Sequence, residues 1–280
     1  MTAAAHDVII SNMSTVHLTV LSGASRGLGR AIAEQVLLQP GKQRLLCISR
    51  KPDSSLDALA REAAAELDQW TADLIDAKPA AGQLHEWLRQ FDDETFDTVT
   101  LVNNAGTVAS LRRLGDSDGG DVINALRVGL EAPMMLTAAF LSGTSAWRAQ
   151  RRVLNVSSSA GRKPVSGQAP YCAAKAGMDH YTRVVALEQS VVPNGARLVS
   201  IAPGNMDTDM QHQLRNSDPA QFPDGPRFVR FKAEGRLQHP AAVAEKMLGL
   251  LARKDFGDDP VVYLHDAWGG AAVEAPPTIF

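Results

Sequence analysis

Tyr171 and Lys175 are the pair of side chains in this sequence best suited to acid–base chemistry. They lie four residues apart, and residues at that spacing share one face of a helix. A free tyrosine ionises at about pH 10, and a nearby ammonium group favours the phenolate. The pair therefore predicts a phenol with a lowered pKa, which can exchange a proton with a substrate near neutral pH.

A glycine-rich turn with the pattern G-x-x-x-G-x-G follows the apolar run 16–21 and precedes a helical segment. Glycine permits a tight turn and a close approach of the backbone to a pyrophosphate. The helix that follows offers free N–H groups to the anion. A glycine-rich turn without a ligand is the alternative, but its place between a strand and a helix favours a dinucleotide. The residues expected to bind it are Gly23, Ser25, Arg26, Gly27, Leu28 and Gly29.

The residues after the second predicted strand indicate which dinucleotide binds. An NAD site usually places an acidic residue about 20 residues beyond the glycine motif, to bind the ribose 2′-hydroxyl. Ser49 is at that position here, and Arg50 and Lys51 follow it. Arg26 and Arg50 would each make a charge-assisted bond of about 1.5–3 kcal/mol to a 2′-phosphate. The sequence therefore favours NADP(H), with a solvated Arg50 as the alternative.

Three motifs occur in order along the chain: the glycine turn at 23–29, N-N-A-G at 103–106, and Ser158 followed by Y-x-x-x-K at 171–175. Each motif is short, but their order and their placement at the ends of predicted strands are informative. Together they resemble the classical short-chain dehydrogenase/reductase family over residues 16–265. The resemblance implies an NADP(H)-dependent oxidoreductase that acts on CH–OH and C=O groups.

The resemblance also implies the catalytic roles. Tyr171 would transfer the substrate proton, Lys175 would lower its pKa and bind the nicotinamide ribose, and Ser158 would hold the substrate oxygen. Ser157 and Ser159 are adjacent alternatives to Ser158. The 13-residue spacing to Tyr171, and a glycine three residues after Ser158, favour Ser158.

Further residues match the family's cofactor positions. Asp73 and Leu74, at the end of the third predicted strand, would contact adenine. The turn from Asn104 to Gly106 would line the adenine-ribose side, and Thr208 would hold the nicotinamide amide, unless it is a simple loop hydroxyl. The complete set is Asp73, Leu74, Asn104, Ala105, Gly106, Pro203, Gly204 and Thr208.

Gly129 departs from the family's pattern. Members usually carry an asparagine in the helix after N-N-A-G, where it supports a water-linked proton relay from the lysine. The segment RVGLEAPMMLT places Gly129 in that position, and Asn124 is five residues too early. Either the local alignment is wrong, or the backbone carbonyl and water suffice, or activity is reduced.

Seven strand-length runs alternate with helical segments along the chain. The expected strands are 16–21, 44–49, 69–74, 97–104, 151–158, 197–204 and 261–266. The expected helices are 31–39, 57–68, 80–91, 119–141, 170–189 and 240–253. Such alternation predicts an α/β fold with a parallel sheet covered on both faces, here a single doubly wound Rossmann-type domain over residues 16–280. Residues 1–15 are expected to be a loose N-terminal extension.

Residues 205–236 are rich in proline, glycine and aspartate and are too long for a plain connection, so they are predicted to form a substrate lid. The lid carries Phe222, Phe228 and Phe231, with Met206 and Met210. An apolar lid would suit an aromatic or aliphatic ketone. Packing of the lid against the domain explains the same residues equally well.

The composition excludes several classes of protein. A net charge of −3 and a pI of about 6.2 give no basic surface for nucleic acid. The two cysteines, Cys47 and Cys172, predict no disulfide framework and fit a cytoplasmic protein. No run of 18 apolar residues occurs, so the sequence predicts no membrane span. By resemblance, we expect a homodimer or homotetramer formed through helices 119–141 and 170–189.

The last third of the chain indicates the substrate class. The segments PYCAAKAGMDHYTRVVALEQ, PGNMDTDMQHQLR and RFVRFKAEGRL are similar to bacterial benzil reductases and sepiapterin-reductase-like carbonyl reductases. This resemblance implies reduction of a small ketone or diketone with NADPH. A 3-oxoacyl-thioester reductase is the alternative within the family, and a catalytically silent NADP(H)-binding regulatory protein is the alternative of another class.

Overall fold

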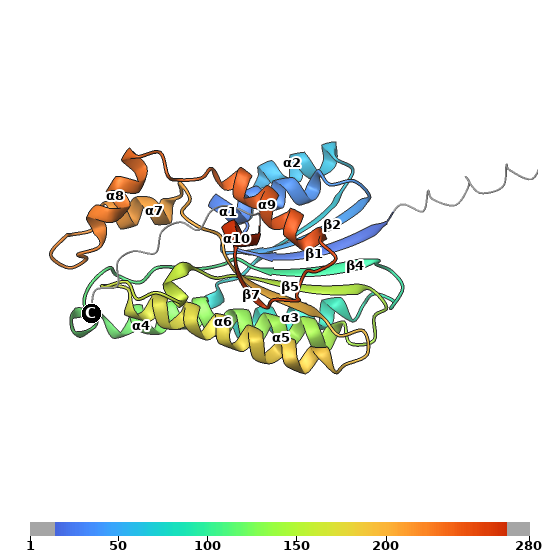
Figure 1. The fold of residues 1–280 in the computed structure, drawn as a ribbon. Helices are drawn as coiled ribbons and strands as arrows, with labels where there is room; N and C mark the ends of the chain where they lie inside the picture. The colour runs from blue at the N-terminus through green and yellow to red at the C-terminus, as the bar shows by residue number, and fades with distance from the viewer. Residues whose placement is uncertain (1–14, 268–280) are drawn as a thin grey trace, which may run out of the picture.

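Seven parallel strands form the sheet at the centre of the computed structural model, which describes residues 15–267 (Figure 1). Their order is β3-β2-β1-β4-β5-β6-β7. The first three strands extend the sheet in one direction from β1, and the chain then crosses back so that β4 pairs with the other side of β1. This reversal confirms the predicted doubly wound α/β fold, and it opens a crevice at the carboxyl ends of the strands. The strands are β1 (Val16–Ser22), β2 (Lys42–Ser49), β3 (Glu66–Thr71), β4 (Thr98–Asn103), β5 (Gln150–Val156), β6 (Arg197–Ala202) and β7 (Val261–Tyr263).

Helices cover both faces of the sheet (Figure 1). One layer contains α1 (Gly27–Leu37), α2 (Ser54–Glu62) and α9 (Pro240–Ala252), and the other contains α3 (Ala77–Leu88), α4 (Gly119–Leu126), α5 (Ala132–Gly143) and α6 (Ala169–Ser190). Successive strand residues point to opposite faces, so Leu45 joins the core beneath α1 and α9, while Leu46 joins the core beneath α3 and α5. Both faces are buried, which explains the continuous apolar runs in the sequence.

The segment between α2 and β3 differs from the prediction. Residues 66–68 were expected at the end of a helix, but they begin β3. Helix α2 ends at Glu62, and Ala64 has a left-handed backbone with φ of 53°. A helix cannot continue through that conformation, so the chain turns into the strand despite its alanine-rich sequence.

The third and seventh strands each end three residues before the predicted position, and the fifth and sixth strands end two residues before it. The third strand ends at Thr71, and Asp73 instead caps a short 3-10 helix, Leu74–Asp76, by accepting the Ile75 N–H at 3.1 Å. The last strand stops at Tyr263, and α10 (Leu264–Ala267) follows. In both places a short helical turn begins at a leucine, Leu74 or Leu264, that was assigned to the strand.

The helix expected at 119–141 is continuous but not uniform. A π-helical segment, Arg127–Glu131, joins α4 to α5. By length and apolar composition alone, the 25-residue segment Gly119–Gly143 could cross a bilayer. Within its apolar stretch of 18 residues, 39% is buried in the structure. In this structure the segment packs against α3 and α6, as a helix that covers the sheet does.

The predicted lid contains two helices, α7 (Asp209–Arg215) and α8 (Gly225–Ala233). Its ends are tied together, because Gln238 donates to the Asn205 carbonyl at 2.9 Å and accepts from the Asp207 N–H at 3.0 Å. Phe222 is fully buried and packs the lid against the domain. Phe228 and Phe231 also line the main cavity, which lies at the carboxyl ends of the strands. Packing of the lid therefore explains Phe222, and an apolar lining for a substrate fits Phe228 and Phe231.

The predicted N-terminal extension lies outside the described residues, apart from Thr15, and so do residues 268–280 of the predicted domain.

Candidate active site

A cavity of about 970 Å³ lies at the carboxyl ends of the strands, between the glycine turn and the lid. Its walls are formed by the turns that follow β1 and β4 and by residues of α6, α7 and α8. Every predicted site residue lines it: Gly23, Ser25, Arg26, Gly27, Leu28, Gly29, Arg50, Asp73, Leu74, Asn104, Ala105, Gly106, Ser158, Tyr171, Lys175, Pro203, Gly204 and Thr208. Folding thus brings together residues from all three motifs and the lid.

The glycine turn is packed against the N-N-A-G turn. A Cβ on Gly23 would lie 2.8 Å from the Ala105 Cα, and a Cβ on Gly29 would lie 2.0 Å from the Gly23 carbonyl oxygen. The Asn104 amide donates to the Gly23 carbonyl at 3.0 Å, and the Ser22 hydroxyl accepts from the Asn104 and Ala105 N–H groups at 3.1 Å. The glycines are therefore required for backbone packing as well as for access to a phosphate.

The N-terminus of α1 fits an anionic group. Arg26 precedes the helix with an extended backbone and no side-chain cap, and the first turn of the helix holds no acidic residue. The free N–H groups and the helix dipole therefore face the cavity without a protein anion. The glycine turn, which has no room for added Cβ atoms, and the uncapped start of α1 together form a cradle of backbone groups. This cradle fits the pyrophosphate of a dinucleotide.

The cations proposed for the 2′-phosphate lie at the rim of this cradle. Arg50 is exposed and lines the cavity, while Arg26 is paired at 3.0 Å with Asp209 of the lid, both being largely exposed. Asp53 is an acid close to the end of β2, but it caps α2 and pairs with Arg30 at 2.6 Å. Asp53 is thus engaged in contacts with α1 and α2 and does not line the cavity.

Ser158 and Tyr171 come from different elements. Ser158 follows β5 and caps a short 3-10 helix, Ser159–Gly161, with its hydroxyl accepting the Ala160 N–H at 3.1 Å. Burial raises the pKa of the Tyr171 phenol, and a hydrogen bond with Ser158 opposes that rise. In the protein without its cofactor, desolvation thus exceeds the effects that favour the phenolate. The predicted lowering of this pKa concerns the enzyme with its cofactor bound, and it stays a prediction.

Lys175 is buried beneath the tyrosine. Its ammonium lies 5.8 Å from the centre of the Tyr171 ring and donates to the Val156 carbonyl at 2.7 Å. Burial lowers the pKa of Lys175 to about 8, and the negative charge of Asp179 acts in the opposite direction. The lysine is thus held at the end of β5, close to the phenol.

The lowered pKa of Lys175 predicts a pH dependence of stability. Between the folded pKa of about 8 and the ordinary value of 10.5, the unfolded chain binds more protons than the folded chain. The stability contributed by this group therefore rises with pH through that window and is constant below it. We expect the free energy of unfolding, relative to Lys175→Met, to rise accordingly in urea titrations. A difference independent of pH would contradict the prediction.

Gly129 lies in the π-helical segment and faces α6. It is buried, and a Cβ there would lie 3.0 Å from the Cβ of Ala174, the residue before Lys175. Gly129 is therefore next to the residue that precedes Lys175, and its alignment with the family's asparagine stays a prediction. Asn124 lines the main cavity from α4 instead, so it does not occupy the same place.

Gln168 is a cavity residue that the sequence motifs did not indicate. It is only 5% exposed, lines the cavity, and stands one turn before Tyr171 at the start of α6. Backbone bonds hold it in place, from its N–H to the Val165 carbonyl at 3.2 Å and from the Cys172 N–H to its carbonyl at 2.8 Å. Within residues 15–267 its carboxamide has no hydrogen-bond partner, and a single glutamine in a loop carries no recognisable pattern.

The fold and the cavity define an oxidoreductase that uses a nicotinamide cofactor and acts on C=O or CH–OH groups. The family model for short chain dehydrogenases matches residues 17–219. The chain is 32% identical over 247 residues to a benzil reductase ((S)-benzoin forming) of Bacillus cereus, covering 88% of this chain and 98% of that protein. It is 33% identical over 260 residues to a sepiapterin reductase of Meriones unguiculatus, covering 88% and 95%. The chain belongs to the short-chain dehydrogenase family.

Solved structures show the same fold. The KRED1-Pglu enzyme is similar with a TM-score of 0.73 and 25% identity, covering 88% of this chain and 100% of that one. A 3-oxoacyl-[acyl-carrier protein] reductase from Brucella melitensis, solved in complex with NAD, has a TM-score of 0.73 and 20% identity, covering 91% and 96%. The second likeness concerns the fold alone.

Proposed function

We propose that this enzyme reduces a ketone or diketone carbonyl to an alcohol with NADPH. The names of its relatives, benzil reductase ((S)-benzoin forming) and sepiapterin reductase, support the reduction of a carbonyl. The observation that supports the proposal is the convergence of Ser158, Tyr171 and Lys175 with the glycine turn on one cavity. NADPH, when bound, supplies the hydride. Tyr171 donates the proton to the substrate oxygen, Ser158 orients that oxygen, and Lys175 stabilises the phenolate and binds the ribose.

The environment of Tyr171 suits a proton donor. Burial raises the pKa of its phenol, which is the direction that keeps the proton available for donation. The Lys175 ammonium then stabilises the phenolate that remains.

Turnover with a panel of carbonyl compounds tests the proposal. Purified protein is mixed with NADPH and benzil, an aliphatic 1,2-dione, sepiapterin or acetoacetyl-CoA, and the loss of NADPH absorbance is followed. Consumption with a diketone or sepiapterin is expected. Turnover with acetoacetyl-CoA alone would favour the 3-oxoacyl-thioester reductase, and tight NADPH binding without any turnover would favour the silent regulatory protein.

Removal of Arg26 and Arg50 is expected to reduce the preference for NADPH over NADH. The double variant Arg26→Ala/Arg50→Ala should weaken NADPH binding about tenfold or more, because two charge-assisted bonds are lost. NADH, which lacks the 2′-phosphate, should bind almost unchanged. Dissociation constants from fluorescence titration check this, with Lys51→Ala as the control at an adjacent cation outside the cavity lining. A wild-type preference for NADH would refute the assignment.

Gln168 favours a substrate with a second carbonyl. Its carboxamide, beside the cavity, can donate to an oxygen next to the one held by Tyr171, and such a hydrogen bond contributes about 0.5–1.5 kcal/mol. Gln168→Leu should therefore lower kcat/KM for benzil about 3–10-fold and leave deoxybenzoin unchanged, since that ketone has the same two rings but one carbonyl. Equal losses for both compounds would show that Gln168 does not select dicarbonyl substrates.

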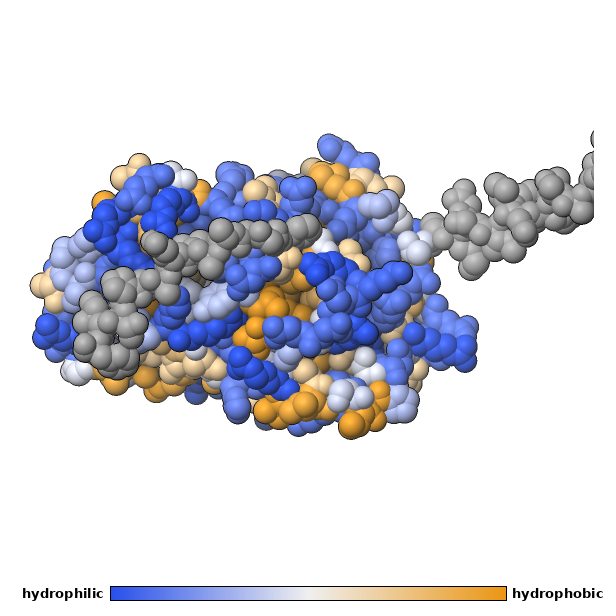
Figure 2. Space-filling model, in the orientation of Figure 1, coloured by the Kyte–Doolittle hydropathy of each residue, from blue (hydrophilic) through white to orange (hydrophobic). Residues whose placement is uncertain are grey.

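We also propose a cytoplasmic homo-oligomer. Both cysteines are free thiols, as a reducing compartment requires. Apolar side chains gather on the outer side of α4, α5 and α6, along the lower edge of the molecule in Figure 2. Such a patch is typical of an interface between copies. The large apolar side chains exposed on these helices are Ile123, Met134, Val184 and Leu187.

A further inference from the structure

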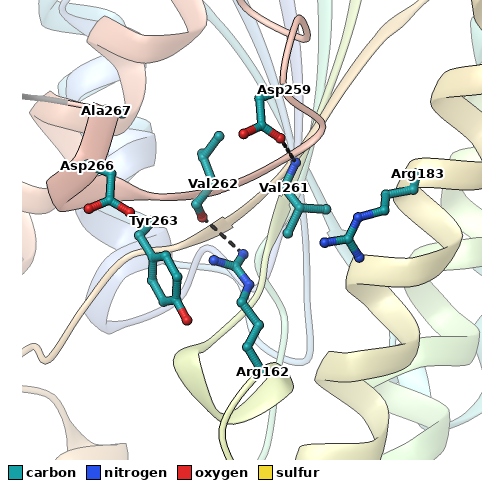
Figure 3. Close-up of a pocket in the computed structure, with 8 residues that line it drawn as sticks. All are labelled: Arg162, Arg183, Asp259, Val261, Val262, Tyr263, Asp266 and Ala267. Carbon is teal, nitrogen blue, oxygen red and sulfur yellow. Dashed lines mark hydrogen bonds between the residues drawn. The ribbon is translucent and has the colours of Figure 1, made fainter. Parts of the chain in front are cut away.

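A buried ion pair joins α6 to the turn that follows β5. Arg162 donates through Nε to Asp179 Oδ2 at 2.8 Å, with side-chain exposures of 17% and 3%. Arg162 also borders a small cavity of about 350 Å³, which it shares with Arg183 and Tyr263 (Figure 3). Neither member of the pair belongs to the lining of the main cavity.

The pair joins the two elements that carry the proposed catalytic groups. Arg162 directly follows the 3-10 helix that Ser158 caps, and its N–H bonds back to the Ser159 carbonyl at 3.0 Å. Asp179 lies one turn beyond Lys175 on α6. Where the two elements meet they are in backbone contact, because a Cβ on Gly161 would lie 2.8 Å from the Lys175 carbonyl.

Each member is also anchored to the edge of the sheet. The Ser200 hydroxyl of β6 donates to Asp179 Oδ1 at 2.6 Å. The Arg162 guanidinium donates through Nη2 to the Val262 carbonyl of β7 at 3.1 Å and lies 4.1 Å from the centre of the Tyr263 ring (Figure 3). The ion pair is therefore braced by two strands and has little freedom to shift.

We propose that Arg162 and Asp179 are positioning residues, which hold the Ser158 turn and helix α6 at the separation that lets Ser158 and Tyr171 reach the same substrate oxygen. This inference rests on the proposed carbonyl reduction. The last bond from this strand to β6 runs from the Ser157 N–H to the Ile201 carbonyl at 2.8 Å. Ser158 is the first residue beyond it and bonds within its own turn, so the sheet does not hold Ser158 directly. A buried ion pair adds little stability compared with apolar residues of similar size, whereas its directed bonds fix geometry.

The double variant Arg162→Met/Asp179→Leu separates positioning from stability. Removing only one partner would leave a buried charge unpaired, but removing both should preserve folding. We expect Tm close to wild type, NADPH affinity within about twofold, and KM for the ketone little changed. We expect kcat to fall about 10–100-fold, because small displacements of reacting groups cost that much. Arg162→Lys, which keeps the charge and one bond, should recover part of the loss.

Arg183→Met is the matched control, because Arg183 lies one turn beyond Asp179 on α6 and borders the same small cavity. It should leave kcat unchanged. All kcat values are divided by the folded fraction from circular dichroism at the assay temperature, so a destabilised variant remains informative. A double variant with wild-type kcat per folded molecule would overturn the proposal.

Hydrogen exchange tests the same inference without a substrate. The amides of Gly161, Arg162 and Lys163 bond to carbonyls of the Ser158 turn, and their exchange should accelerate in the double variant but not in Arg183→Met. Unchanged exchange would contradict the positioning role. If the wild type reduced no carbonyl, the proposed function would fail, while this measurement would still decide whether the pair holds the turn.

Discussion

Tyr171→Phe is expected to lower kcat for carbonyl reduction about 10²–10⁴-fold, the usual contribution of a positioned acid or base. The substitution removes only the hydroxyl that would donate the proton, so NADPH affinity and Tm should stay near wild type. Steady-state kinetics with the best carbonyl substrate, together with a fluorescence titration of NADPH, measure both effects. The result would separate proton donation from binding.

Tyr181→Phe provides a matched control for this substitution. Tyr181 is a second tyrosine on α6, is 9% exposed, and does not line the main cavity. Its hydroxyl is therefore expected to be dispensable for turnover. Normal activity in Tyr171→Phe would exclude that residue as the proton donor, and an equal loss in both variants would indicate damage to the helix.

Gly29→Ala is expected to abolish measurable NADPH binding and to destabilise the fold by about 1–3 kcal/mol, the usual cost of overpacking. The added Cβ would lie 2.0 Å from the Gly23 carbonyl oxygen and 2.4 Å from the Asn104 amide nitrogen. Both belong to the turns that form the cradle, so one of them must move. Titration with NADPH and thermal unfolding measure the two effects.

Gly82→Ala is the control for the added methyl group. Gly82 lies within α3, and nothing lies within 4 Å of the Cβ it would acquire. Alanine is favoured over glycine inside a helix by about 0.5–1 kcal/mol, so this variant should be slightly stabilised and should bind NADPH normally. Wild-type NADPH affinity in Gly29→Ala would show that the turn does not hold the cofactor.

Much of the fold could be predicted because its strands are buried on both faces. Leu45 and Leu46 face different helical layers, so the whole run is apolar and can be recognised without any tertiary information. The errors occurred where local sequence was ambiguous. Residues 66–68 follow an alanine-rich helix and pair with β2 to become a strand, and this pairing depends on a partner more than 20 positions away in the chain.

The site was predictable to the extent that its motifs are local. The glycine turn and the Tyr171–Lys175 pair each occupy a few consecutive residues, so their spacing alone indicates their geometry. The contacts of Arg26 were not predictable, because Asp209 is 183 positions away. Gln168 carries no motif, and its importance arises only from burial beside the cavity.

The sequence by itself determined the chemical groups, because Tyr171 and Lys175 share a helix face whatever surrounds them, and a glycine turn between a strand and a helix binds phosphate through its own backbone. Only the tertiary structure decided the electrostatic state of those groups. It placed Tyr171 where desolvation raises the pKa of the phenol in the absence of cofactor, and it joined Arg162 to Asp179. Desolvation and long-range pairing depend on which segments meet, and that is settled only when the chain folds.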